Sequence, residues 1–293
     1  MTTKIIVLGA EGMLGQEMLK TLGESAAELD WVLYPTSRSG NRSGYEPFSF
    51  PSSQVEVLLN ECAVDEGDYV LNCAGWIPQR SSKENSHELL DAVMVNSVLP
   101  LALGVLCKDK GVRLVSIGTD CVFSGKHGED YTEDSPLSPN DFYGTTKALA
   151  ETSQGNQMTL RTSIIGQSPR TQKGLFEWFK SQPREAEIDG YIDHIWNGTS
   201  TNFFSRVVRG IIKNDAYSTG VQHLVPFDSC SKAELLEMFK IKLGRHDISI
   251  RHTLGDTAIR RVLGTSNSAR NKFLWNLGGF ESPPTITQAV DSL

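Results

Sequence analysis

The sequence of 293 residues lacks the features that mark several classes of protein. Its five cysteines form no Cys-x-x-Cys pair and are odd in number, and its six histidines form no His-Glu-x-x-His arrangement. We therefore expect reduced thiols and no bound metal. The apolar run in MTTKIIVLGA is too short for a secretory signal, and no stretch approaches the length of a membrane span. A cytoplasmic protein without a membrane partner is predicted.

The chain also lacks an excess of basic residues. Lys and Arg total 28 against 35 Asp and Glu, a net charge of −7. Nucleic-acid binding requires a basic surface, so no nucleic-acid partner is expected, although a local basic pocket for a phosphate remains compatible with this balance. Hydrophobic residues make up 39% of the chain, and its length is sufficient for a buried core.

The first half of the chain alternates short apolar runs with helical patterns. Strands are predicted at 4–9, 31–37, 69–75, 113–119 and 158–166, and helices at 13–23, 55–62 and 91–111. The helix at 91–111 is expected to be mostly buried and bent at a proline. Continuous apolar strands between helices indicate a doubly wound α/β fold, with a parallel sheet covered on both faces. Ligands of such folds lie beyond the carboxyl ends of the strands.

The pattern changes from about residue 167. A short amphipathic helix and a turn-rich loop are followed by a capped helix, a strand at 221–226, another helix at 231–244 and a weakly patterned tail. We expect the helix and strand within about 199–226 to return to the large sheet. The rest of this half would form a smaller region packed on the first.

A glycine-rich turn separates the first strand from the first helix. Gly9, Gly12 and Gly15 permit a tight turn and a close approach of backbone N–H groups to a pyrophosphate, and the helix N-terminus adds partial positive charge. The GxxGxxG spacing differs from the commoner GxGxxG, and a structural turn would explain it as well. Its place at the first strand of a βαβ unit favours a dinucleotide site.

The end of the second strand bears on the choice of dinucleotide. An NAD site usually offers Asp or Glu there to the ribose 2′-hydroxyl, whereas this chain has Thr36, Ser37 and Arg38, with Arg42 close behind. A hydroxyl and a guanidinium suit a 2′-phosphate, so NADPH is favoured and NADH remains possible. Solvated loop arginines are the alternative. After the third strand, the small residues Cys73, Ala74 and Gly75 could lie against the adenosine half or simply form a packing turn.

Tyr143 and Lys147 stand four residues apart, on one face of a predicted helix. Reduction of a ketone leaves negative charge on oxygen, which requires a proton donor within hydrogen-bond reach. A free tyrosine has a pKa near ~10, and a neighbouring ammonium is expected to lower it. Thr119, at a strand end, supplies a further hydroxyl. The YxxxK spacing is common by chance, but its order after the glycine-rich turn and the threonine favours catalysis.

This ordered set resembles the extended short-chain dehydrogenase/reductases. Four segments are similar to the dTDP-4-dehydrorhamnose reductase group: GMLGQEML, VNSVLP, GTDCVFSGKHGEDYTEDSPLSPNDFYGTTKALAE and TLRTSIIG. The resemblance is dense over 4–166 and sparse afterwards. It implies a Rossmann domain for NADP at 1–166, extended by about 199–226, and a substrate-binding region at 167–198 and 227–293. It also implies a homodimer.

The resemblance assigns roles to matching residues. Tyr143 would donate the proton, and Thr119 would polarise the substrate carbonyl. Lys147 would activate Tyr143 and hold the ribose of the cofactor. Cofactor contacts are implied for Gly9, Gly12, Met13, Leu14, Gly15, Ser37, Arg38, Cys73, Ala74, Gly75, Ser163 and Ile164. Substrate contacts are implied for Asp120 and Cys121.

Further substrate contacts are expected from the second region. Trp196 could stack on a base or sugar and Asn197 could bond it, or Trp196 could be a core aromatic; Arg260 and Arg261 could meet a diphosphate or lie on a solvated helix face. The group usually carries STDYVF where this chain has GTDCVF. The Cys121 form resembles a sister group that acts on UDP-linked N-acetylated sugars.

The sequence hypothesis is an NADPH-dependent reductase of the 4-keto group of a nucleotide-linked 6-deoxyhexulose. Two alternatives remain open. A same-fold epimerase or 4,6-dehydratase would usually place an acid after Asp120, where this chain has Cys121. A non-enzymatic NADP-binding regulatory subunit, like the β subunit of methionine adenosyltransferase, could retain Tyr143 and Lys147.

Overall fold

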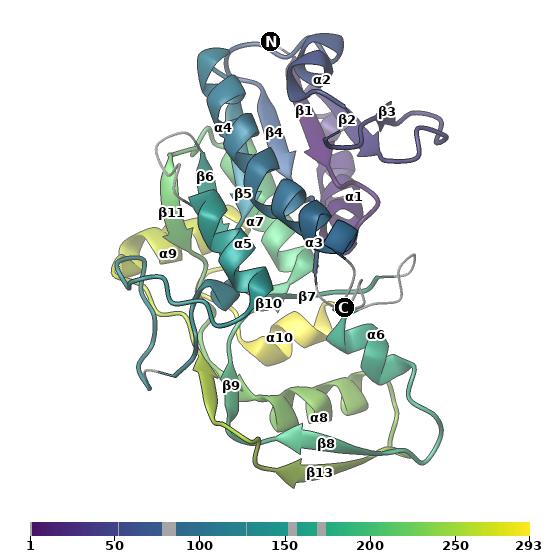
Figure 1. Ribbon diagram of the computed structural model, residues 1–293, viewed down its shortest axis with the longest axis vertical. Coiled ribbons are helices and arrows are strands. Elements are labelled where there is room, and N and C mark those ends of the chain that lie inside the picture. Colours follow the sequence, from purple (N-terminus) through teal and green to yellow (C-terminus); the bar gives the residue numbers. More distant parts are fainter. Residues whose placement is uncertain (1, 52, 78–85, 127, 152–156, 169–173) are drawn as a thin grey trace.

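The structure is a computed structural model that describes residues 2–51, 53–77, 86–126, 128–151, 157–168 and 174–293. Its centre is a sheet of seven parallel strands in the order β11-β6-β5-β4-β1-β2-β3 (Figure 1). The strands are β1 (Thr3–Leu8), β2 (Trp31–Ser37), β3 (Glu46–Pro47), β4 (Tyr69–Asn72), β5 (Arg113–Ile117), β6 (Met158–Arg161) and β11 (Gly220–His223). The prediction of a doubly wound parallel α/β fold is confirmed.

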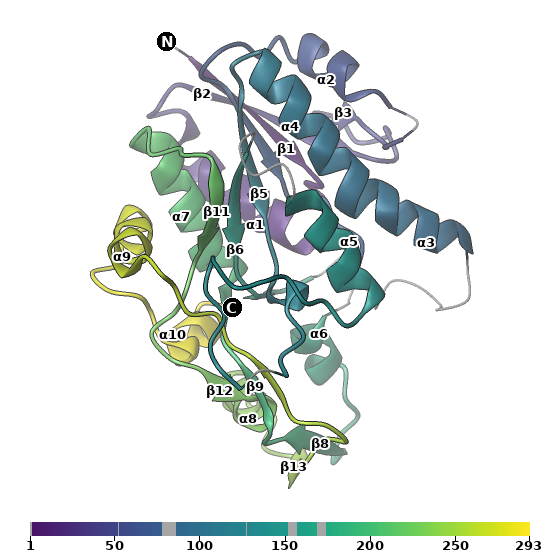
Figure 2. The same ribbon diagram turned by 60° about the vertical axis from the view of Figure 1, so that its left-hand side comes forward.

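Helices cover both faces of this sheet (Figure 2). One face carries α1 (Met13–Ala26), α7 (Thr201–Lys213) and α9 (Ser268–Leu277); the other carries α2 (Val55–Glu61), α3 (Ser86–Val93), α4 (Leu99–Asp109) and α5 (Phe142–Ala150). Alternate residues of β1 serve the two faces: Ile5 and Val7 join the core with α1 and α7, whereas Ile6 and Leu8 join that with α2 and α4. Because both faces are buried, the central strands β1 and β4 carry apolar runs without alternation.

The helix that the sequence predicts at 91–111 is longer and less buried than expected. It runs as one helical segment over Ser86–Asp109, with a π-helical turn at Met94–Val98 just before Pro100, which has no N–H to donate. By length and composition alone this segment could cross a membrane, so the prediction that no stretch approaches such a span was wrong. Only 39% of its most apolar window is buried.

The second region lies below the sheet in Figure 1 and has its own apolar core. It contains α6 (Leu175–Lys180), β8 (Glu187–Tyr191), β9 (His194–Trp196), β12 (Cys230–Ser231), α8 (Lys232–Lys242), β13 (Ser249–Thr253), β14 (Ile259–Arg261) and α10 (Ile286–Asp291). Strands β12, β9 and β14 form one small sheet, and β13 pairs with β8. A further parallel pair joins β7 (Ile164–Ile165) to β10 (Thr199–Ser200).

Several elements after residue 199 contact the first half of the chain. α7 packs on α1, and β11 extends the large sheet beside β6. The weakly patterned tail also sends α9 onto α7, through Leu274 and Trp275, which are fully buried. β14 meets the loop after β5, where Arg260 donates its backbone N–H to the Gly125 carbonyl over 2.8 Å.

Candidate active site

The glycine-rich turn leads from β1 into α1 at the carboxyl edge of the sheet. Gly9 has a positive φ of 68°, and a Cβ there would lie 2.8 Å from the backbone of Ala74. A Cβ on Gly15 would lie 2.2 Å from the Gly9 carbonyl oxygen. Gly12 is the N-cap of α1 and makes no side-chain hydrogen bond to the first turn of the helix. These residues fit the pyrophosphate of a dinucleotide.

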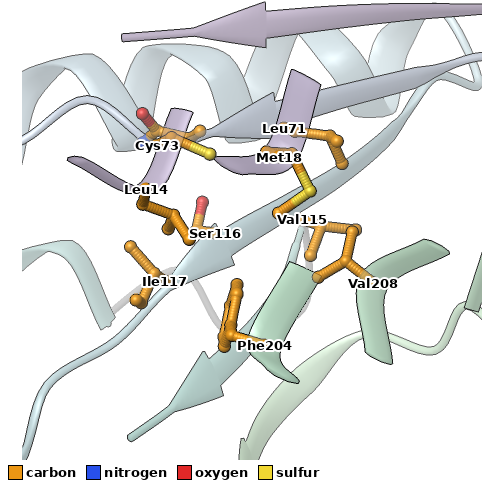
Figure 3. A pocket seen from close by; sticks show the side chains of 10 residues that line it. Leu14, Met18, Leu71, Cys73, Val115, Ser116, Ile117, Phe204 and Val208 are labelled. Atoms are coloured by element: carbon orange, nitrogen blue, oxygen red, sulfur yellow. The ribbon is translucent and has the colours of Figure 1, made fainter. Parts of the chain in front are cut away.

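The loop after β4 lies directly beside this turn. Cys73 donates its backbone N–H to Leu8 over 3.1 Å, and Ala74 lies against Gly9. Cys73 and Leu14 also line a small cavity of about 10 Å³ between α1, β4, β5 and α7 (Figure 3). That volume is about one water molecule, so the cavity is a packing gap beneath the site. The Leu14 side chain points into this core, so only its backbone is available to a cofactor.

The end of β2 carries an acidic neighbour that the sequence did not predict. The Ser37 hydroxyl is buried and donates to Glu11 Oε2 over 2.9 Å, and Arg42 Nη1 lies 3.7 Å from Glu11 Oε1. Arg38 is exposed. The sequence did not indicate Glu11 as a residue near the ribose 2′ position, because an acid is expected there on β2. This carboxylate comes instead from the glycine-rich turn.

Tyr143, Lys147 and Thr119 come together beyond β5. Tyr143 and Lys147 lie one turn apart on α5, and the Tyr143 phenol hydrogen-bonds the Thr119 side chain. The Lys147 ammonium donates to the carbonyl oxygen of Ile117, the last residue of β5, over 3.0 Å. Thr119 accepts from the Cys121 backbone N–H over 3.2 Å, which orients its hydroxyl. This is the grouping that the spacing in the sequence predicts.

The electrostatics of the tyrosine differ from the expectation. Burial raises the pKa of Tyr143 above its ordinary value, and Cys121 adds to the increase, while the hydrogen bond with Thr119 opposes it. Burial also lowers the pKa of Lys147, which Glu151 partly offsets. The prediction that the ammonium lowers the tyrosine pKa was therefore wrong for this structure. Burial outweighs the other influences, and the phenol is protonated at neutral pH.

Two glycines allow the catalytic elements to approach each other. A Cβ on Gly118 would lie 2.9 Å from Arg161 Cα, which explains the glycine that replaces a serine in the GTDCVF motif. A Cβ on Gly144 would lie 2.1 Å from the Cys121 carbonyl oxygen. Asp141 caps α5 by accepting from the Gly144 backbone N–H over 2.7 Å, so the helix begins directly against the loop after β5.

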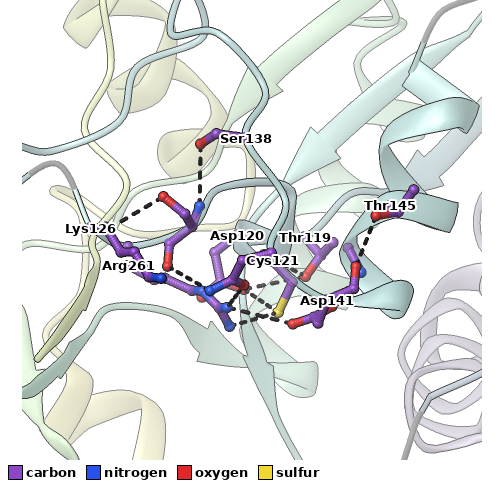
Figure 4. A network of polar contacts seen from close by, with 12 residues as sticks. Thr119, Asp120, Cys121, Lys126, Ser138, Asp141, Thr145 and Arg261 are labelled. Atoms are coloured by element: carbon purple, nitrogen blue, oxygen red, sulfur yellow. Dashed lines mark hydrogen bonds and ion pairs between the residues drawn. The ribbon is translucent and has the colours of Figure 1, made fainter. Parts of the chain in front are cut away.

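Arg261 reaches this site from β14 (Figure 4). Its Nη1 donates to Cys121 Sγ over 3.5 Å, and its Nη2 donates to Asn140 Oδ1 over 2.7 Å and lies 3.5 Å from Asp141. Within the described residues, its Nε is buried without a hydrogen-bond partner. Arg260 points elsewhere and pairs with Asp130 over 2.6 Å. The sequence suggested diphosphate contact for both arginines, but only Arg261 lies at this site.

Lys232, which the sequence did not single out, is a second cation beside the site. It begins α8, and its ammonium lies 4.8 Å from the centre of the Trp196 ring. Burial raises the pKa of Asp120, whereas Lys232 and then Arg261 oppose this increase. Burial likewise lowers the pKa of Lys232, and Asp120 opposes that change. Asp120 and the two cations therefore form one charged cluster next to Thr119.

Two expected substrate residues have other roles. Trp196 is 4% exposed within the core of the second region, with Lys232 over its ring, so it has no free face for a base or sugar. Asn197 is committed to Leu263, donating to its carbonyl over 2.8 Å and accepting from its N–H over 2.9 Å. Substrate contact by either residue is not supported, and the core alternative holds for Trp196.

The remaining site residues lie at the end of β6. Ser163 accepts from the Thr199 backbone N–H over 2.9 Å, and Ile164 begins β7. Asn96 was missed, although it stands in the VNSVLP motif. It is buried in the π-helical turn, accepts from the Trp76 backbone N–H over 2.9 Å and donates to Thr146 on α5 over 3.1 Å. Asn96 thus joins the loop after β4 to the helix that carries Lys147.

Comparison with known proteins agrees with this geometry. The family model described as RmlD substrate binding domain matches residues 3–251. The spore coat polysaccharide biosynthesis protein SpsK of Bacillus subtilis is 29% identical over 151 residues, covering 51% of this chain and 47% of its own. A dTDP-4-dehydrorhamnose reductase of Streptomyces griseus is 31% identical over 146 residues, covering 50% and 43%. The matches thus span about half the length of these curated relatives.

Among solved structures, the dTDP-4-dehydrorhamnose reductase of Bacillus anthracis in complex with NADP superposes with a TM-score of 0.76. It is 20% identical to this chain, and the match covers 99% of this chain and 98% of that one. At this identity the likeness establishes the shared fold.

Proposed function

Since the chain belongs to the RmlD substrate binding domain family, we propose that it is an NADPH-dependent reductase. Its substrate would be a 6-deoxyhexulose linked to dTDP or UDP, and the enzyme would reduce the 4-keto group of this sugar. The product would serve in deoxysugar and polysaccharide precursor synthesis. The name of the Streptomyces griseus relative supports this class of substrate, and the name of the Bacillus subtilis relative supports a role in polysaccharide synthesis. A cytoplasmic enzyme fits such a role.

One observation carries the proposal: the Tyr143 phenol bonds Thr119 beside the ammonium of Lys147, at the strand edge that also bears the glycine-rich turn. The raised pKa of Tyr143 keeps the phenol protonated, which a proton donor in a reduction requires. Thr119 would hold the substrate carbonyl oxygen with the phenol. Lys147, fixed to Ile117, would bind the ribose hydroxyls of the cofactor.

The cofactor would lie across the carboxyl edge of the sheet. Gly9, Gly12 and Gly15 would hold its pyrophosphate, residues 73–75 its adenosine half, and Ser163 and Ile164 its amide end. Bound NADPH supplies the hydride, and the chain supplies the proton and the alignment. In this arrangement residues 1–166 and about 199–226 would bind the cofactor, and 167–198 and 227–293 would bind the substrate.

Lys232 and Arg261 support an anionic substrate next to Thr119. Their cationic groups lie beside Asp120 and Cys121, and the Nε of Arg261, which has no hydrogen-bond partner among the described residues, could donate to a substrate oxygen. A diphosphate or a polar sugar substituent fits these donors. The same region disfavours the dehydratase alternative, because Cys121 stands directly after Asp120, where such enzymes usually carry a second acid.

A homodimer is part of the proposal. The helical segment Ser86–Asp109 exposes Leu90 by 58% and Val105 by 52%, an apolar surface of the kind that paired helices bury. Light scattering of the purified chain would report its mass, and a monomer at micromolar concentration would exclude this part of the proposal.

The decisive experiment is loss of NADPH absorbance with a panel of UDP- and dTDP-linked 4-keto sugars and no partner protein. Tyr143→Phe should retain NADPH binding and lower kcat by about 10²–10⁴-fold, the usual contribution of a general acid. Tyr191→Phe removes the same hydroxyl from β8 and should leave kcat unchanged. Equal turnover in Tyr143→Phe would end the catalytic role. No turnover by the unmodified chain would favour the regulatory-subunit alternative.

A further inference from the structure

The carboxylate of Glu11 contacts the end of β2, where folds of this kind are expected to hold the ribose 2′ group that distinguishes the two nicotinamide dinucleotides. The residue at the end of β2 in such folds meets the ribose 2′ position, and here that residue is Ser37. Ser37 is 1% exposed, and its hydroxyl donates to Glu11 Oε2 over 2.9 Å while lying 3.1 Å from the Ser39 hydroxyl. The serine that would receive a 2′-phosphate is therefore already bonded to an anion.

Arg42, which follows the expected phosphate ligand Arg38 in the sequence, also lies near Glu11. Arg42 Nη1 lies 3.7 Å from Glu11 Oε1, and its guanidinium lies 4.1 Å from the centre of the Tyr45 ring. Two contacts therefore restrain Arg42 beside the carboxylate. Arg38 remains exposed and unconstrained by either contact. Glu11 therefore places a carboxylate beside the hydroxyl and guanidinium groups at the end of β2.

The chemistry of the two ribose substituents makes this carboxylate selective. A 2′-phosphate carries about −1.5 to −2 charge at pH 7, so Glu11 would repel it and compete with it for Ser37 and Arg42. A 2′-hydroxyl can instead donate a hydrogen bond to the carboxylate. Glu11 thus performs, from the turn after β1, the task that an acidic residue at the end of β2 performs in NAD sites.

We propose that Glu11 is the residue that sets dinucleotide preference, so that the chain accepts NADH alongside NADPH. The inference rests on the proposed function only in taking this edge of the sheet as the dinucleotide site. Removal of the charge, with Ser37 and Arg42 left in place, converts the pocket into a 2′-phosphate site. Glu11→Gln keeps the size and the capacity to bond Ser37, so it tests charge alone.

The experiment is calorimetric titration of the full chain with 2′,5′-ADP and with 5′-ADP, which carry the two alternative 2′ groups. Glu11→Gln should raise the affinity ratio in favour of 2′,5′-ADP by about tenfold or more, and this change should shrink at 0.5 M salt. Glu24→Gln makes the same change in net charge far from the pocket, at a residue paired with Arg209, and should leave the ratio unchanged.

A second pair of probes, NADPH and NADH followed by their fluorescence on binding, should show the same shift in Glu11→Gln. An unchanged ratio in Glu11→Gln, or an equal shift in Glu24→Gln, overturns the proposal while the reductase assignment stands. If neither adenosine phosphate nor either dinucleotide binds, this inference and the proposed function both fail. No sugar substrate is needed for any of these measurements.

Discussion

Arg161 and Glu151 form an ion pair in which both side chains are almost completely buried. Arg161 Nε donates to Glu151 Oε1 over 3.3 Å, and its Nη2 donates to Glu151 Oε2 over 2.5 Å. The pair joins the end of β6 to the end of the helix that carries Tyr143 and Lys147. His223 extends it, with its Nε2 2.5 Å from Arg161 Nη1 and its Nδ1 2.7 Å from the Gly264 carbonyl oxygen.

Breaking this pair should strongly destabilise the protein. Glu151→Gln leaves the Arg161 charge buried without its counterion, which should lower the free energy of unfolding by about 3–5 kcal/mol. Urea denaturation followed by circular dichroism measures the change. Arg251→Gln breaks an exposed ion pair with Asp189 and should change the curve far less. Similar losses in the two variants would contradict the role of burial.

Stability should fall as the pH drops from 6.5 towards 4. Burial, and then the charge of Arg161, lower the pKa of His223 from 6.5 to about 4. The unfolded chain therefore binds a proton in this range before the folded one does, so the stabilisation is complete above pH 6.5 and is lost on acidification through pH 4.

Replacing the His223 imidazole separates its contribution to the pH dependence of stability from that of nearby carboxylates. His223→Gln should flatten the dependence of unfolding free energy on pH between 4.5 and 6.5. Glu133, which accepts from the His223 backbone, has a pKa lowered to about 2 and acts at lower pH. An unchanged slope in the variant would show that another group titrates in this range.

The glycine of GTDCVF should be required by packing. Gly118→Ser restores the residue of the related motif but brings a Cβ to 2.9 Å from Arg161 Cα, so we expect a loss of about 1–3 kcal/mol in unfolding free energy. A Cβ on Gly23 in α1 would meet no atom of the described residues within 4 Å, so Gly23→Ala should be neutral or stabilising by up to about 1 kcal/mol. Thermal denaturation compares the two, and a neutral Gly118→Ser would refute the packing explanation.

Lys232 should act on the substrate and leave the cofactor unaffected. Lys232→Met keeps the apolar stem but removes the ammonium, which should raise the KM for the nucleotide sugar by about tenfold or more, as expected for a lost charged hydrogen bond. NADPH binding should be unchanged. Lys180→Met, on the exposed side of α6, is the matched control. A normal KM in Lys232→Met would assign the cation to the balance of charge around Asp120 alone.

Local sequence patterns predict much of the cofactor and catalytic site. Gly9, Gly12 and Gly15 are read from their place between an apolar strand and a helix, and the Tyr143–Lys147 pair from helical spacing. The carboxyl ends of β4 and β5 then bring the loops of Cys73 and Thr119 to one edge, because parallel neighbours align their ends. These relationships depend on backbone geometry, which short stretches of sequence specify.

Local sequence patterns could not predict which residues of the second region lie near the site. Trp196 and Asn197 were plausible ligands until the packing of β9 against β14 and Leu263 buried them. Lys232 gave no signal, because its nearness to Asp120 arises where α8 of the second region meets the loop after β5. The weakly patterned tail gave no signal for α9, whose Trp275 bonds the Val225 carbonyl over 2.8 Å inside the first core.

By itself, then, the sequence determined the alternation of strands and helices in the first half of the chain, the glycine-rich turn and the Tyr–Lys pair, since each depends on residues within a few positions of one another. Only the tertiary structure decided that Glu11 meets Ser37, that Arg261 reaches Cys121 and that burial raises the pKa of Tyr143. Those contacts join segments far apart in the chain, and their distances and desolvation are set by how whole elements pack.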